Sequence, residues 1–358
     1  MKHGLLRIFL PLLLAAVLTA ALAACRDDDG GADGGARATL TVWLSLPEPE
    51  GTGPGQAQHR LGDPGEAVPE DDVWDDLTLL LVYDDPTTPA QTISLTSQQY
   101  EALPPVAEGS KLRRLQLDVP EGKAYLYGAT GNQGELGNPA EALYDAGERN
   151  AHRTEVEALT ISNDYAKGKE DAVARKVSVA TGFYHTPENP DTPAPLELTA
   201  QVDGHPGDAV PTLTLTRLAT KIDVQWDAAD AVLKGVTDVR VTDFSLDGGH
   251  GITGPGSGRL FPTLNKGSEP LMGSAEFTNT TDVSQRNGRV YHYVFSDGVS
   301  QPSITFQITA QDGGSTEEHD YELMFGETLR PAAWYKVNAT IKGFTGNHTI
   351  TIFDDRQP

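Results

Sequence analysis

Short runs of β-forming residues, separated by turn residues, recur along most of this chain. In the second half they follow one another at a spacing of about eight to twelve residues, with apolar and polar side chains alternating inside each run. Such spacing is typical of stacked antiparallel sheets and leaves little room for long helices. We therefore predict an all-β fold made of two β-sandwich domains in tandem with few short helices.

The predicted strands cover residues 38–46, 76–83, 91–95, 111–119, 123–130, 196–202, 212–226, 236–246, 290–296, 303–310, 319–324, 334–342 and 349–353. Two short helices are predicted over residues 97–103 and 139–147. In the second, Pro139 suits the first turn, and Gly147 suits the position just past the end.

The chain has 358 residues, which exceeds a typical single domain, and 38% of them are hydrophobic. Prolines and glycines cluster over residues 183–211, so we place a boundary there. The predicted domains are 38–207 and 208–358. Residues 47–72 show no periodicity and many Gly, Pro and Gln residues, and we expect them to form a long flexible loop.

Charge and motif content argue against several classes of function. A formal net charge of −24 repels phosphate backbones, so nucleic-acid binding is not expected. The nine histidines have no metal-ligand spacing, and no cofactor or metal is predicted. Residues 249–254 match G-x-G-x-x-G, but Pro255 and further glycines follow where a phosphate-binding helix would have to begin. Carboxylates are numerous, but nothing marks out a hydrolytic pair, so we predict that the chain is not an enzyme.

The first 24 residues have the pattern of a secretory signal. Lys2 and Arg7 precede a long apolar run, and small residues lead directly to Cys25, the only cysteine. This arrangement resembles a bacterial lipoprotein signal with a lipobox, which implies that the mature chain begins at an acylated Cys25. The alternative is a plain signal peptide with an incidental cysteine.

Residues 25–37 form a spacer rich in Asp and Gly. Arg26 followed by Asp27, Asp28 and Asp29 resembles the signature that directs lipoproteins of Bacteroides-type bacteria to the outer face of the outer membrane. The alternative is a solvated linker without an address function. The expected location is therefore the outer membrane, by a lipid anchor, with the protein exposed at the cell surface.

Several segments, taken in order, resemble the fimbrillins, the lipoprotein-derived pilus subunits of Bacteroides-type bacteria. The matching parts are the Cys25 lipobox, an acidic spacer, an isolated strand at 38–46, a loop containing Arg60, and the segments 77–83, 122–132, 213–224 and 329–343. The resemblance implies transthyretin-like, Greek-key sandwiches and a structural or adhesive fimbrial subunit assembled by strand exchange. Its partners would be other fimbrial subunits, joined by β-strand addition, and possible host or bacterial surface ligands.

The resemblance also implies roles for particular residues. The first strand, with Leu40, Val42, Leu44 and Leu46, would be the releasable one. A protease specific for arginine would cut between Arg60 and Leu61, although an ordinary loop arginine is the alternative. Polymer-forming members carry a longer C-terminal extension. Here Ile350 and Ile352 mark only a short candidate donor strand, so tip, anchor and accessory roles stay open.

A surface lipoprotein that binds glycans for a carbohydrate-uptake system is the competing class. It would use exposed aromatic side chains as stacking platforms. Trp74, in an acidic loop edge, is the best exposed candidate, whereas Trp43 and Trp226 lie in alternating strands and are expected in cores.

Overall fold

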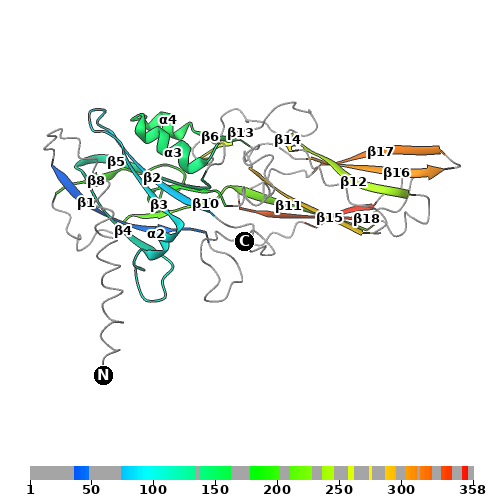
Figure 1. The fold of residues 1–358 in the computed structure, drawn as a ribbon, viewed down its shortest axis with the longest axis horizontal. Helices are drawn as coiled ribbons and strands as arrows, with labels where there is room; N and C mark the ends of the chain where they lie inside the picture. The colour runs from blue at the N-terminus through cyan, green and yellow to red at the C-terminus, as the bar shows by residue number, and fades with distance from the viewer. Residues whose placement is uncertain are drawn as a thin grey trace, which may run out of the picture. The chain divides into compact units, whose positions relative to one another are not determined.

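The computed structural model describes residues 36–47, 74–133, 137–162, 178–200, 210–227, 236–245, 257–261, 274–275, 287–295, 303–312, 315–324, 332–340 and 349–353. Within these ranges the chain is mostly β-strand, with three short helices and several sheets (Figure 1). The mostly-β class predicted from the strand spacing is therefore confirmed. The boundary at residues 207/208 and the Greek-key topology stay predictions.

The first half contains β1 (Arg37–Ser45), β2 (Asp76–Tyr83), β3 (Gln91–Thr96), α2 (Ser97–Ala102), β4 (Arg113–Pro120), β5 (Gly122–Gly131), α3 (Pro139–Glu148), α4 (Arg153–Glu157), β6 (Thr160–Ser162), β7 (Ala180–Phe183) and β8 (Leu196–Leu198). The second half contains β9 (Thr212–Thr214), β10 (Thr216–Arg217), β11 (Ala219–Asp227), β12 (Val236–Ser245), β13 (Ser257–Arg259), β14 (Ser274–Ala275), β15 (Asn287–Phe295), β16 (Ser303–Asp312), β17 (Ser315–Met324), β18 (Trp334–Thr340) and β19 (Thr349–Phe353).

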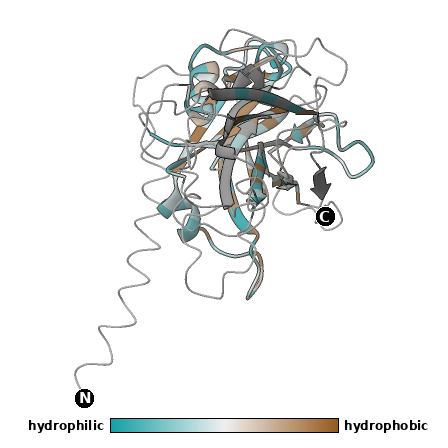
Figure 2. Ribbon diagram, turned by 90° about the vertical axis from the view of Figure 1, so that its right-hand side faces the viewer, coloured by the Kyte–Doolittle hydropathy of each residue, from teal (hydrophilic) through white to brown (hydrophobic). Residues whose placement is uncertain are grey.

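Two sheets organise the first half. One has three strands in the order β4-β1-β9, and the other has the order β10-β7-β5-β2-β3, with β8 pairing with β5. Apolar side chains of both sheets meet in one core that includes Leu40, Leu79, Leu115, Leu126 and Leu213. Figure 2 shows hydrophobic and hydrophilic residues along the strands; β4 alternates between more and less exposed positions, as expected for a strand with an inner and an outer face, whereas β2 is buried at seven of its eight positions.

The second half adds two four-stranded sheets, in the orders β15-β11-β18-β19 and β14-β12-β16-β17. Ile222, Val224 and Val337 are buried in the first of them, and Ile304 and Ile308 are buried in the second. In β18 the residues alternate between buried and half-buried positions, as its sequence pattern predicts, whereas β11 is buried on both faces over most of its length.

Several details differ from the predicted elements. The pattern misses α4, β6, β7, β13 and β14, which have ten residues or fewer and carry no clear period. It also merges β9, β10 and β11 into one strand at 212–226. Alternation continues through all three, but they pair with different partners: β9 with β1, β10 with β7, and β11 with β15 and β18.

Two strand pairs are parallel, although the pattern predicts antiparallel sheets. They are β1 with β9 and β11 with β18. Both pairs join strands that are far apart in the sequence, and a long intervening chain can supply the crossover that a parallel pair requires. The prediction of purely antiparallel sheets is wrong at these two places.

The helix predicted over residues 139–147 is α3, one residue longer. Pro139 occupies its first turn as predicted, and the Asn138 side chain accepts a hydrogen bond from the backbone N–H of Ala140. Gly147 lies inside the helix rather than past its end. A Cβ at Gly147 would overlap the Thr92 hydroxyl, so this glycine lets α3 lie close to the sheet.

Candidate functional site

The strand predicted to be releasable, β1, is formed by an alternating sequence with one apolar side. Ala38, Leu40, Val42 and Leu44 have exposed fractions of 2%, 5%, 0% and 0%. Leu46 lies just past the strand and is half-buried against the same core. The side chains between them are intermediate or exposed, so β1 has one dry face and one face toward the outside.

Two strands flank β1, but over different lengths. β4 pairs with it in antiparallel register from Arg37↔Pro120 to Leu44↔Arg113. β9 pairs with it in parallel only over Trp43 to Ser45. Two further backbone hydrogen bonds close this end: the Trp43 N–H donates to Pro211 and the Leu215 N–H donates to Ser45, each at 2.9 Å. Among the described residues, the first part of β1 is therefore paired on one side only.

Burial holds β1 more strongly than charge does. Complete burial of a Leu or Val side chain contributes about 1.5–3 kcal/mol, so Leu40, Val42 and Leu44 together contribute roughly 5–9 kcal/mol before the entropy of ordering the strand is subtracted. The loss of β1 from this site therefore costs much free energy, unless another apolar strand takes its place or the chain is cut after β1.

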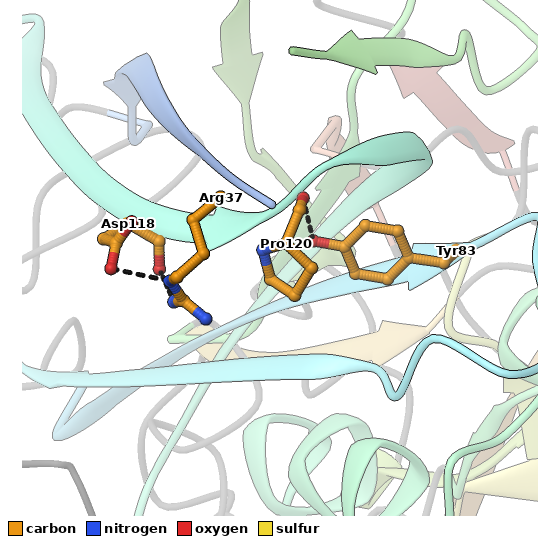
Figure 3. A network of polar contacts seen from close by, with 4 residues as sticks. All are labelled: Arg37, Tyr83, Asp118 and Pro120. Atoms are coloured by element: carbon orange, nitrogen blue, oxygen red, sulfur yellow. Dashed lines mark hydrogen bonds and ion pairs between the residues drawn. The ribbon is translucent and has the colours of Figure 1, made fainter. Parts of the chain in front are cut away.

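An ion pair at the beginning of β1 joins it to β4. The Arg37 Nε lies 2.7 Å from Asp118 Oδ2, and the guanidinium also donates to the Asp118 carbonyl at 2.6 Å (Figure 3). Both side chains are about half exposed or more, at 47% and 68%, so the pair adds little stability. Nearby, the Tyr83 hydroxyl donates to the Pro120 carbonyl at 3.1 Å, and burial raises the pKa of Tyr83.

The short pairing of β9 with residues 43–45 of β1, which we call the β9 wall, depends on Gly182 in β7. A Cβ at Gly182 would overlap the carbonyl oxygen of Thr214, so the absence of a side chain lets the end of β9 lie against β7. The side chains of Leu213 and Leu215 also lie within 3.4 Å of where a Cβ on Gly128 would be. The sequence pattern does not predict this part of the site. Its only signal is Gly182 within the Thr-Gly-Phe segment, which could indicate a close approach of another backbone.

The candidate donor strand is β19, at an edge of its sheet. It pairs in antiparallel register with β18, with Ile352 opposite Val337 and Ile350 opposite Ala339. In this structure these residues therefore complete a sheet of their own chain. The remaining predicted residues, Cys25, Arg60 and Leu61, lie outside the described residues.

The positions of two tryptophans differ from those expected for glycan binding. Trp74 is only 2% exposed and makes an edge contact with Tyr100, with ring centroids 5.8 Å apart, so the prediction that it is an exposed platform is wrong. Trp43 is on the outer face of β1 and is half-buried, where a core position is predicted. Trp226 is buried as predicted. The side chain of Trp334 lies outside the described residues.

Titratable groups in the described part of the chain form no metal site: it contains no group of three His, Cys, Asp or Glu residues able to hold an ion. Asp76 has a raised pKa, chiefly because of burial and also because of the charge of Asp75, but a hydrogen bond from Gln133 opposes the shift. No helix within the described ranges is long and apolar enough to cross a membrane.

Comparison with known proteins finds similarity among solved structures only. No protein family matches the sequence, and no curated protein does. The structure is similar to a protein from Bacteroides eggerthii whose suggested role is cell adhesion (14% identity, 90% of this chain and 92% of that chain, TM-score 0.45). It is also similar to the tip fimbrial protein Mfa3 (10% identity, 89% and 99%, TM-score 0.42) and the fimbrial anchor protein Mfa2 (11% identity, 84% and 90%, TM-score 0.41), both from Porphyromonas gingivalis.

Proposed function

We propose that this chain is a structural, adhesive subunit of a bacterial surface pilus. It is exported as a lipoprotein acylated at Cys25 and assembles by exchanging β1 for a strand of another subunit. Its partners are other fimbrial subunits, and its place is the cell surface, where the outer membrane holds the acylated form. Within the pilus, the candidate roles are tip, anchor and accessory subunit.

The arrangement of β1 carries this proposal. β1 comes first among the described strands, and residues 48–73 separate it from β2, so it can leave without any other strand being pulled out of register. It lies between β4 and β9 and presents Leu40, Val42 and Leu44 to the core. Its departure would uncover unpaired backbone groups above an apolar floor, and such an edge binds a strand from another chain.

The separating residues also contain the proposed cleavage position. A cut between Arg60 and Leu61 would sever β1 from the rest of the chain, whereas a cut after Arg37 would leave β1 in place. Arg37 is also paired with Pro120 in the ladder and tied to Asp118. A protease needs a backbone that is free to enter its active site, and the ladder pairing of Arg37 withholds that backbone.

Among the described residues, nothing favours the competing glycan-binding function. Its best candidate platform, Trp74, is buried, and Trp43 is half-buried on the outer face of β1 rather than fully exposed. We do not propose a catalytic function for this chain.

The test is the N-terminus of the protein isolated from the cell surface, measured by mass spectrometry together with co-purification of pili. A start at Leu61 with pili is expected for a subunit that has exchanged β1, and Arg60→Ala should abolish that start while Arg37→Ala preserves it. An acylated Cys25 start with pili contradicts the exchange of β1 and leaves the role of an anchor that keeps this strand. An acylated Cys25 start without pili in the same preparation contradicts the proposal.

A further inference from the structure

The central sheet of the first half is buried on both faces. Along β2, Leu77, Leu79 and Leu81 face the core that contains β1, whereas Leu80 and Val82 face a second core on the opposite side. All five are at most 3% exposed. This explains why β2 reads as an almost continuous apolar run instead of alternating. The loss of β1 would open only one of these two faces.

Helices α3 and α4 supply part of the second core. Leu143 and Ala146 of α3 and Val156 of α4 are buried in it, and Figure 1 shows both helices on the side of β2 and β5 away from β1. None of these three helix residues belongs to the core that contains β1. The helix-side core, defined by these residues with Leu80 and Val82, is therefore built without contributions from β1, β4 or β9.

A segment from far along the chain joins the helix-side core, which also contains Tyr293 and Phe295 of β15. Residues 257–261 reach it through β13, which pairs with β6 in antiparallel register, and their Leu260 N–H donates to the Leu159 carbonyl at 2.9 Å. The Thr181 hydroxyl of β7 donates to the Leu260 carbonyl at 2.7 Å. Backbone pairing thus fixes this segment to β6, and a side-chain hydroxyl fixes it to β7.

The side chains of this segment are among the most buried in the molecule. Leu260 is 0% exposed and Phe261 is 1% exposed. The Phe261 ring lies 5.3 Å from the ring of Tyr127 and 6.4 Å from that of Phe183, measured between centroids, in tilted and edge arrangements. Because Tyr127 and Phe183 belong to β5 and β7, Phe261 covers the middle of the six-stranded sheet.

We infer that the helix-side core keeps the six-stranded sheet folded after β1 has left, and that residues 257–261 close this core. The inference rests on the proposed release of β1. Its physical basis is that a sheet with one face still packed keeps most of its buried area and its ladder hydrogen bonds. The apolar floor beneath the position of β1 then stays in place for an incoming strand, and residues 257–261, from far along the chain, supply part of the core that holds this floor.

Hydrogen exchange of the full chain, read by mass spectrometry, tests this inference. Leu40→Asp combined with Leu44→Asp places two charges in the β1 core and prevents β1 from docking, whether or not β1 is ever shed naturally. We expect fast exchange in β1 and β4 but at least about 100-fold slowing relative to free peptide in β2 and β5.

Adding Phe261→Ala to the Leu40→Asp, Leu44→Asp protein should abolish the slowing of exchange in β2 and β5. Phe261→Ala alone should leave it in place, and Met324→Ala, at an exposed apolar residue, is the matched control.

Two outcomes would overturn the inference. One is fast exchange in β2 and β5, or general unfolding, in the Leu40→Asp, Leu44→Asp protein, because the helix-side core would then be insufficient. The other is unchanged slow exchange after Phe261→Ala is added. Neither result depends on the N-terminus found at the cell surface, so failure of the proposed function is detected separately from failure of this inference.

Discussion

Single glycines decide how closely parts of this molecule approach one another. Gly182 lets the Thr214 carbonyl lie against β7, and Gly147 lets α3 lie against Thr92. At both positions the close neighbour leaves no room for even one additional carbon. A β-strand or helix would otherwise favour most residues other than proline over glycine, since glycine weakens both. Gly182 and Gly147 are therefore explained by tertiary contacts and not by the conformational preference of the local backbone.

Gly182→Ala should destabilise the protein and loosen the β9 wall. Because the added methyl group meets backbone, relief requires movement of the strand, and overpacking of this kind costs about 1–3 kcal/mol. The measurement is the urea midpoint, with hydrogen exchange of residues 43–45 as a local readout. Gly128→Ala is the control, because its methyl group would meet only leucine side chains, which can move. Equal stability of the Gly182→Ala variant and wild type would contradict this account.

At the level of elements, the two predicted helices begin with side-chain caps in different settings. Thr96 accepts from the Gln99 N–H at 3.2 Å in an exposed capping box at α2. Asn138 at α3 is 4% exposed, accepts from the Ala140 N–H at 3.0 Å, and donates to the Asn132 carbonyl at 2.9 Å. Its buried position means that no water replaces these partners when its side chain is removed.

Asn138→Ala is therefore expected to cost more stability than Thr96→Ala. Loss of an exposed cap costs about 0.5–1 kcal/mol, and loss of the second, buried hydrogen bond to Asn132 adds about 0.5–1.5 kcal/mol. Urea denaturation of the two variants and of wild type measures the difference. Equal losses at the two caps would show that burial of the Asn138 partners does not matter.

At the scale of the whole molecule, buried tyrosines link its folding to high pH. Burial raises the pKa of Tyr100 to about 12, although the charge of Arg113 and a hydrogen bond to the Leu46 backbone partly oppose the shift. Burial also raises the pKa of Tyr83 and Tyr127, and the charge of Glu157 adds to the effect at Tyr127. The folded protein therefore keeps these hydroxyls protonated at a pH where the unfolded chain ionises them.

Stability is expected to fall as the pH rises above about 10, the ordinary pKa of tyrosine. Below that pH the tyrosine hydroxyls make their full contribution to the free energy of unfolding. This contribution is lost as the pH rises from the pKa in the unfolded chain through the raised pKa in the folded protein. Urea midpoints between about pH 9 and about pH 11 measure the fall. Tyr100→Phe should show a shallower decrease, and an unchanged pH dependence in that variant would argue against a role for Tyr100.

By itself, the sequence determined the features that depend on neighbouring residues. The alternation along residues 38–46 predicted that β1 is a strand, and Pro139 predicted the start of α3, because side-chain direction and backbone preference follow from local geometry. The alternation did not decide which face of β1 is buried, since the pattern also predicted a core position for Trp43. Only the tertiary structure decided which strands flank β1, that Trp74 is buried, and that Phe261 covers the far face of the sheet. Those contacts join residues far apart in the chain, and their energy arises when two distant surfaces lose water together, a quantity that no local pattern contains.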